Sequence, residues 1–384
     1  MRSPMDEQTY LNFYRNTVLG CSKATYNHIC NELIRERRIV IDGQRSIDDF
    51  LQDGQPVVSD RADTLHFDKK DAERIVSETA LDSHFSGFYE EWEFSKLYKY
   101  SVPLFYQLPE GSTELLHVLE SKGIKKLDKD KFTPDRVLNT SLKDSEPLMW
   151  QCGDGLFVKF VLQKFYYNLE RFEQVDYRYP VVLFFNPECS VVEIRYDSVR
   201  YSRDEMSSDM SYEALVKDCI DWIKRELGLK LFRCEHNDFI QTINDPNNAD
   251  VRIYKQMMQL SSGGAAELTA SESADYILPF IGEIKELIEE NDALFREAED
   301  IRKLLLKYLN DKEDTASYPY VYVKWVKPVE SQSYMVKVTF DYLNREHTLL
   351  QHITGICKDL GMRRMNDAIQ YLCQHGSFIK GEEA

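Results

Sequence analysis

Three consecutive segments rich in Val, Phe, Tyr and Ile constrain the fold more than any other part of the chain. They are GLFVKFVLQKFYYN (155–168), YRYPVVLFFN (177–186) and SVVEIRYDSVRY (190–201). β-Branched and aromatic residues favour strands, and the cluster Asn186-Pro187-Glu188-Cys189 between the last two segments is typical of a turn. The sequence therefore predicts a central antiparallel β-meander.

The third strand and the helix after it predict how this meander is buried. Side chains alternate between the two faces of a strand, so Val192, Ile194 and Tyr196 should face one side and Glu193 and Arg195 the other. The next segment has apolar residues at helical spacing, which are Leu215, Cys219, Ile220, Ile223 and Leu227 before Gly228. With the strand-like KLFRCE that follows, these elements predict an α+β domain.

The chain of 384 residues is long enough for two or three domains, since single cores rarely grow beyond about 250–300 residues. The expected regions are a winged-helix-like unit at 1–48, a mixed acidic connecting region at 49–150, the meander domain at 151–260, a linker and long helix at 261–315, and a β-hairpin plus helix-turn-helix-like module at 316–384. The linker is the small, polar stretch SSGGAAELTASES at 261–273.

The long helix is expected from about 276 to 310, where apolar residues recur at seven-residue spacing. Asn291 interrupts that pattern, and beyond Ala298 the stripe shifts to Ile301, Leu305 and Tyr308. Two interpretations remain open: the helix packs on its own protein, or it forms the seam of a dimer.

The stretch LGCSKATYNHICNELIRERRIV (19–40) has the pattern of a capped amphipathic helix. Ser22 stands where its hydroxyl can cap the first exposed amides, and an apolar stripe at helical spacing follows, made of Tyr26, Ile29, Cys30 and Leu33. The opposite face carries Lys23, Asn27, Asn31 and Arg35, each four residues apart. Asn can bind adenine with two hydrogen bonds, and Lys and Arg bind guanine or phosphate.

This stretch resembles the winged helix-turn-helix module of bacterial transcription regulators, with its Leu-Gly turn at 19–20, Ser22 and Thr25. The resemblance covers only residues 8–48 and implies a recognition helix from about Lys23 to Glu36. It also implies a wing from Arg38 to Ile47, with Arg38 and Arg45 on the wing or the DNA backbone, and double-stranded DNA as the partner. A weaker resemblance lies at 345–384, where a helix, Leu360-Gly361 and a second helix would present Arg363, Arg364, Asn366 and Gln370.

The charge of the chain limits how it could bind nucleic acid. A net charge of −17 argues against non-specific coating of nucleic acid or of an anionic membrane. Residues 22–45 nevertheless carry five cations against three carboxylates, a local balance of +2. Because phosphate contacts supply much of the affinity of such modules, a patch this small would need a dimer or a second DNA contact.

The cysteines and the termini indicate a cytoplasmic protein without a membrane segment. Eight cysteines are scattered with no CxxC pair, which is typical of a reduced protein in which they are small buried apolar residues. The N-terminus MRSPMDEQTY lacks the apolar core of a signal peptide, and no apolar run approaches the roughly 20 residues that span a bilayer.

Catalytic motifs are missing from the sequence, so no catalytic residue, metal or cofactor is expected and the balance is against an enzyme. The nearest approach to a metal-dependent nuclease is Glu193-Ile194-Arg195 with Asp197 beyond it. Three functions follow: a DNA-binding protein with a central sensing or partner-binding domain, a non-catalytic subunit of a multi-protein phage-defence or DNA-processing complex, and a metal-dependent nuclease. A homodimer or other protein partners suit the first two.

Overall fold

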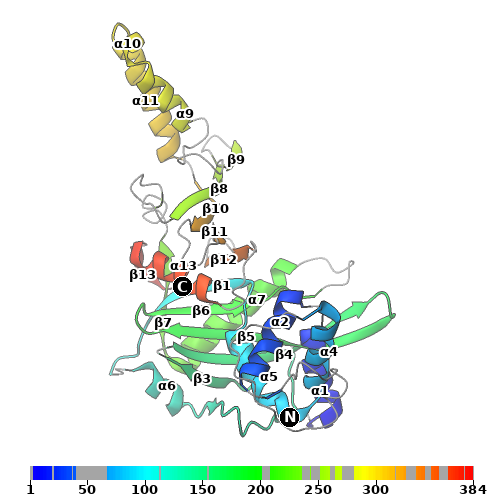
Figure 1. Cartoon of the computed structure of the whole chain (residues 1–384). Helices are drawn as coiled ribbons and strands as arrows, with labels where there is room; N and C mark the ends of the chain where they lie inside the picture. The colour runs from blue at the N-terminus through cyan, green and yellow to red at the C-terminus, as the bar shows by residue number, and fades with distance from the viewer. Residues whose placement is uncertain are drawn as a thin grey trace.

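The computed structural model describes most of the chain and contains both helices and strands, as an α+β fold requires. The described residues are 3–19, 21–36, 38–39, 67–111, 114–153, 155–200, 208–235, 243, 251–259, 264–269, 281–315, 317–325, 334–341, 347–353, 362–375 and 377–383. They form a body at one end and an arm that projects from it and ends in a pair of helices (Figure 1).

The predicted meander is confirmed. Its strands are β4 (Gly155–Asn168), β5 (Glu173–Asn186) and β6 (Val191–Tyr196), which pair antiparallel in chain order. The Asn186 side-chain oxygen accepts hydrogen bonds from the amides of Glu188 at 3.0 Å and Cys189 at 3.4 Å, and so fixes the turn between β5 and β6.

The two faces of the meander are buried as the alternation predicts. Val192, Ile194 and Tyr196 lie in one hydrophobic core, together with α7 (Ser208–Trp222) and its continuation η3 (Ile223–Leu227), while Glu193 and Arg195 face the other side. The five stripe residues predicted for this helix are all buried. Gly228 ends the helix with a φ of 67°, a left-handed conformation that glycine adopts without strain.

The sheet branches at β1 (Tyr100–Gln107). One edge of β1 pairs with β6. On the other edge, Tyr100 and Ser101 pair with β12 (His347–Ile353), while Phe105 to Gln107 pair with β7 (Lys230–Glu235), which continues to β13 (Ser377–Glu383). The main path runs β2-β3-β4-β5-β6-β1-β12-β11-β10-β8-β9. Strands from the regions 49–150, 151–260 and 316–384 therefore share one sheet.

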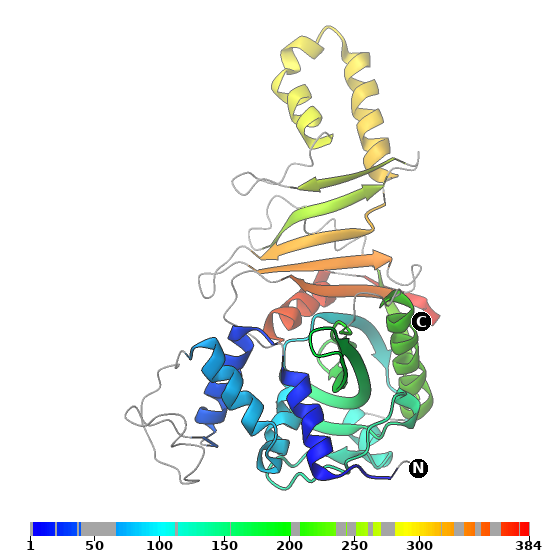
Figure 2. The same cartoon turned by 90° about the vertical axis from the view of Figure 1, so that its right-hand side faces the viewer.

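The arm is a ladder of antiparallel strands that carries the sheet away from the body (Figure 2). Beyond β12 its strands are β11 (Tyr334–Asp341), β10 (Tyr320–Trp325), β8 (Val251–Gln259) and β9 (Ala265–Thr269). β10 and β11, which fall in the region of the predicted C-terminal hairpin, pair antiparallel. One face of the ladder packs against α13 (Arg363–His375).

The expected single long helix is instead a helical hairpin, and this expectation was wrong. The chain forms α9 (Ile281–Glu290), α10 (Asp292–Phe295) and α11 (Glu299–Asp314), and turns back on itself at the end of the arm (Figure 2). We call residues 281–314 the helical tip. The break falls at Asn291, whose side-chain amide donates to the carbonyl of Leu287 at 2.8 Å. Asparagine competes in this way with helical hydrogen bonds, and the acidic pair Glu299-Asp300 favours a new helix start.

The N-terminal helices match the sequence prediction up to the wing. They are α1 (Glu7–Val18) and α2 (Lys23–Arg35), and they pack with α4 (Lys69–Thr79) and α5 (Ser86–Ser95) around one hydrophobic core. The Ser22 hydroxyl accepts from the amide of Thr25 at 3.1 Å, as a helix cap should. The predicted wing lies outside the described residues except for positions 38 and 39.

The C-terminal helix-turn-helix expectation is half wrong. Residues 349–353, expected to lie in its first helix, belong to β12, which fills the gap between β1 and β11 in the sheet. The second helix exists as α13, and its Ala368, Ile369 and Leu372 are buried. Tertiary pairing has overridden the local helical pattern in the first segment.

The remaining elements are part of the body. They are η1 (Ser83–Phe85), α6 (Leu115–Ser121), β2 (Lys125–Lys126), η2 (Leu142–Asp144) and β3 (Leu148–Cys152). No helix among the described residues is both long and apolar enough to cross a membrane.

Candidate interaction surface

The polar face predicted for α2 is only partly free. Lys23 and Arg35 are exposed, and Arg35 forms an ion pair with Glu32. The Asn27 amide, in contrast, is bound to the backbone of Phe67: its oxygen accepts from the Phe67 amide at 2.7 Å and its nitrogen donates to the Phe67 carbonyl at 3.3 Å. Asn27 thus fixes the chain that leads into α4.

The other predicted DNA contacts are placed as follows. Asn31 is half-buried, and its amide donates to the carbonyl of Asn27 at 2.7 Å. Arg38 is also half-buried and donates to Glu36 at 2.9 Å and to Asp130 at 3.5 Å, so it faces the body. Arg45 lies outside the described residues. In the weaker C-terminal copy, Gln370 is exposed. The DNA-binding expectation for α2 stays a prediction.

A buried cluster of four charged groups lies between the N-terminal helices and the meander, and sequence reasoning did not find it. Lys159 of β4 and Arg178 of β5 meet Glu90 and Glu93 of α5. The Lys159 and Arg178 side chains are 0% and 1% exposed, and those of Glu90 and Glu93 are 4% and 1% exposed. Two positive and two negative groups cancel, which allows burial of charge.

Every charged group of this cluster has several partners. Lys159 donates to the Glu90 carbonyl at 2.8 Å and to Glu93 Oε2 at 2.9 Å. Arg178 donates from Nη1 to the hydroxyl of Tyr10 at 2.6 Å, and its guanidinium lies 4.0 Å from the centre of the Tyr14 ring. Tyr14 in turn donates to Glu90. Because all four groups are closed off and satisfied, the arrangement serves to hold α1 and α5 on the meander.

The two cations of this cluster change the pKa of Glu93. Burial alone would raise the pKa of Glu93, but the nearby Arg178 and Lys159 outweigh burial and lower it to about 2. Burial raises the pKa of Tyr10 to about 12, although Arg178 opposes that shift. The cluster therefore keeps the Glu93 carboxylate charged and the Tyr10 hydroxyl neutral over the neutral pH range.

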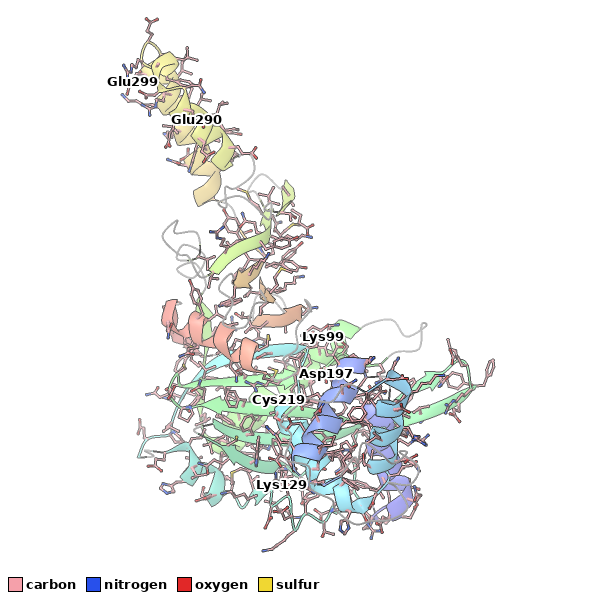
Figure 3. All side chains as sticks on the ribbon, in the orientation of Figure 1. Lys99, Lys129, Asp197, Cys219, Glu290 and Glu299 are labelled. Atoms are coloured by element: carbon pink, nitrogen blue, oxygen red, sulfur yellow. The ribbon has the colours of Figure 1, made fainter. Side chains whose placement is uncertain are left out.

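The residues of the nuclease interpretation are also engaged in structural contacts. Glu193 accepts from Ser101 at 2.7 Å and from Arg195 at 2.9 and 3.1 Å, and it is 1% exposed. Arg195 also donates to Asn366 of α13 at 2.6 Å, which ties that helix to the body. Asp197 accepts from the amide of Lys99 at 3.0 Å, where the arm meets the body (Figure 3).

A metal-binding arrangement is not found in the described part of the chain, where no three potential His, Cys, Asp or Glu ligands gather. A hollow of about 600 Å³ opens in the body beside α1 and α5. Two of its cations, Arg38 and Lys129, are both ion-paired to Glu36. The hollow thus has cations on its wall, but these two already neutralise a carboxylate of the same chain.

Large apolar side chains are exposed in two places among the described residues. One is the end of the β4–β5 hairpin, with Phe165, Tyr167, Leu169 and Phe172. The other is the helical tip, with Ile284, Leu287, Leu294, Ile301, Leu304, Leu305 and Tyr308. Monomeric proteins rarely expose large apolar patches without an interaction to match. The helical tip is therefore the candidate functional site.

Within the helical tip, α11 carries two apolar sides. One side, with Leu306 and Leu309, packs against Ile288 of α9 and Met258 of β8. The other side is exposed and consists of Ile301, Leu304, Leu305 and Tyr308, at positions i, i+3, i+4 and i+7. We call these four residues the exposed stripe. Its spacing is that of a helix face that normally packs against another element.

A signal for this surface is present in the sequence, because Ile301, Leu305 and Tyr308 form an apolar stripe at helical spacing. What the sequence did not show is that α11 covers its inner side with α9 and leaves this stripe bare. Comparison with protein-family models, curated proteins and solved structures finds no match to this chain. The function of the helical tip is therefore inferred from its geometry alone.

Proposed function

We propose that this protein is a non-catalytic subunit of a multi-protein assembly and that the helical tip is the element through which it joins another chain. The observation that carries the proposal is the exposed stripe, in which Leu304 is 67% and Tyr308 59% exposed. Burying large side chains of this kind contributes about 1.5–3 kcal/mol each, which is a strong driving force for association.

The position of the helical tip supports the same function. The arm holds it far from the body, where a partner can reach both of its helices (Figure 1). The charged clusters of the body, in contrast, lie inside and are neutralised by their own partners. The body suits a rigid support, and the helical tip suits a contact.

The test compares proteins that co-purify with a tagged chain from its own cells, after nuclease treatment. The variant is Leu304→Glu combined with Tyr308→Glu. The matched control is Phe172→Glu, which places a charge on an exposed apolar side chain at the other patch. We expect the double variant to lose partners by about tenfold or more, because two charges would have to be desolvated at the contact. Identical sets from all three proteins would reject the proposal.

DNA binding through α2 is the second candidate, favoured by the exposed Lys23 and Arg35 on one helix. Its affinity would depend on phosphate contacts and would fall steeply with salt. Fluorescence anisotropy with a labelled duplex at low and high salt, on the wild type and on the combined Lys23→Ala and Arg35→Ala variant, tests it. Equal binding by the two proteins would remove α2 from any role with DNA.

A further inference from the structure

We propose that the partner of the helical tip is a second copy of this chain, and that two tips form an antiparallel four-helix bundle. This inference rests on the proposed assembly function and names its partner. It places α11 of each copy between its own α9 and the α9 of the other copy. The exposed stripe then lies in the core of the bundle.

The first argument is that α11 has apolar side chains for two packing surfaces and uses one. Leu309 is 6% exposed and packs with Ile288 and Met258 inside the chain. The exposed stripe repeats at the same helical spacing on another side of α11. On α9, Ile284 and Leu287, one turn apart, are exposed as well. A hairpin of two helices leaves such surfaces bare, whereas a bundle of four covers them.

The second argument is charge complementarity between the two helices. α9 carries four glutamates against Lys285, a net charge of −3. The middle of α11, residues 301–310, carries Arg302, Lys303 and Lys307 and no acidic residue, a net charge of +3, while acidic residues at both ends bring the whole helix to −1. A second copy therefore offers its acidic α9 to the basic middle of α11, and a two-fold interface makes this contact twice.

The four glutamates of α9 and Lys307 of α11 are available for such contacts, whereas Arg302 and Lys303 are already ion-paired with Asp292 and Glu299. Within the described residues, no ion pair or hydrogen bond engages the side chains of Glu283, Glu286, Glu289 and Glu290 on α9 or of Lys307 on α11. Glu290 and Glu299 lie at the part of the tip farthest from the body (Figure 3). The order α9, α11, α9, α11 around the bundle places the basic middle of every α11 between two acidic α9 helices and makes all neighbours antiparallel.

A partner of other chemistry would have to match both the apolar stripe and the alternating charge. A second copy supplies both from the same 34 residues of α9 to α11. The complementarity of the tip to itself is thus what selects a second copy as the occupant.

The first experiment is sedimentation velocity of the full chain at micromolar concentration. We expect a species of twice the chain mass of 45.1 kDa for the wild type and for the Phe172→Glu control. The Leu304→Glu and Tyr308→Glu double variant should weaken the dimer by about 100-fold or more and sediment as a monomer. Circular dichroism checks that its fold is unchanged. A monomeric wild type, or a double variant that stays dimeric, would overturn the inference.

The second experiment tests the pairing of α9 with α11. One variant reverses α9 (Glu286→Lys, Glu290→Lys), and the other reverses α11 (Lys303→Glu, Lys307→Glu). Each alone should be monomeric, because like charges would face each other across the interface. Mixed together they should form a dimer, since both α9–α11 contacts between the two chains then join opposite charges. A mixture that stays monomeric would overturn the inference.

These results separate the inference from the proposed function. A monomeric wild type whose co-purifying proteins still depend on Leu304 and Tyr308 would reject the second copy and leave the assembly function standing. If the dimer forms through the tip but the set of co-purifying proteins is the same for the wild type and the double variant, the second copy stands and the assembly with other proteins is rejected.

Discussion

The guanidinium of Arg178 binds the carboxylate of Glu93 through two parallel hydrogen bonds, from Nε to Oε1 at 2.9 Å and from Nη2 to Oε2 at 2.8 Å. The two residues lie 85 positions apart in the chain. This bidentate contact joins α5 to β5 inside the body, and a lysine could not reproduce its geometry. The N-terminal helices are thereby attached to the meander by charge as well as by apolar packing.

The first prediction concerns removal of one charge from this buried cluster. Glu93→Gln should lower the free energy of unfolding by about 3–5 kcal/mol, because it leaves a buried cation without its anion. Urea unfolding followed by circular dichroism measures the change. Glu120→Gln, at an exposed position of α6, is the matched control and should change stability by less than about 0.5 kcal/mol. Equal stabilities of the two variants would show that the cluster does not hold the body together.

The second prediction concerns acid. Arg178 and Lys159 overcome the effect of burial and lower the pKa of Glu93 from its ordinary 4.5 to about 2 in the folded protein. A lowered pKa contributes stability that is present above the unfolded value and is lost as the pH falls through the folded value. The free energy of unfolding should therefore decline between about pH 4.5 and 2. Urea titrations across this window measure the slope, which Glu93→Gln should reduce; an unchanged slope contradicts the assignment.

The third prediction concerns Asn27. Asn27→Ala should destabilise the protein by about 1–3 kcal/mol, because the Phe67 amide and carbonyl lose their partner in a half-buried position. Lys23→Ala, at an exposed position of the same helix, should have almost no effect on stability. Thermal unfolding of the two variants provides the comparison. A neutral Asn27→Ala would mean that this amide is free for a partner after all.

The fourth prediction concerns the cysteines. Cys152 is exposed, while burial raises the pKa of Cys30 to about 12 and also raises that of Cys219. Because the thiolate is the reactive form, iodoacetamide should label Cys152 in the native protein and label Cys30 and Cys219 only after unfolding. Mass spectrometry of the digested protein distinguishes the three sites. Rapid native labelling of Cys219 would mean that α7 opens readily.

Parts of the fold could be predicted because their signals are local. The alternation around Ile194, the helical stripe around Cys219 and the cap at Ser22 each depend on residues close in sequence, and the structure confirms all three. The errors have different causes. Residues 349–353 have a helical pattern but complete a sheet between β1 and β11, whereas the local break at Asn291 divides the expected single helix into α9, α10 and α11.

The candidate site, too, could be predicted from the sequence only in part. The apolar residues Ile301 and Tyr308 could be recognised in the sequence as one side of a helix. Their exposure could not, because it depends on which side of α11 meets α9 and β8. Likewise, nothing local to Asn27 indicates that Phe67, 40 residues later, would occupy its amide.

The sequence by itself determined the strands of the meander, the capped helix α2 and the apolar sides of these elements, since these properties follow from periodicity over a few neighbouring residues. Only the tertiary structure decided which apolar sides are covered, which charges neutralise one another inside the body, and which surface is left for another chain. The physical reason is that burial is a property of contacts between distant segments, and those contacts exist only once the chain has folded.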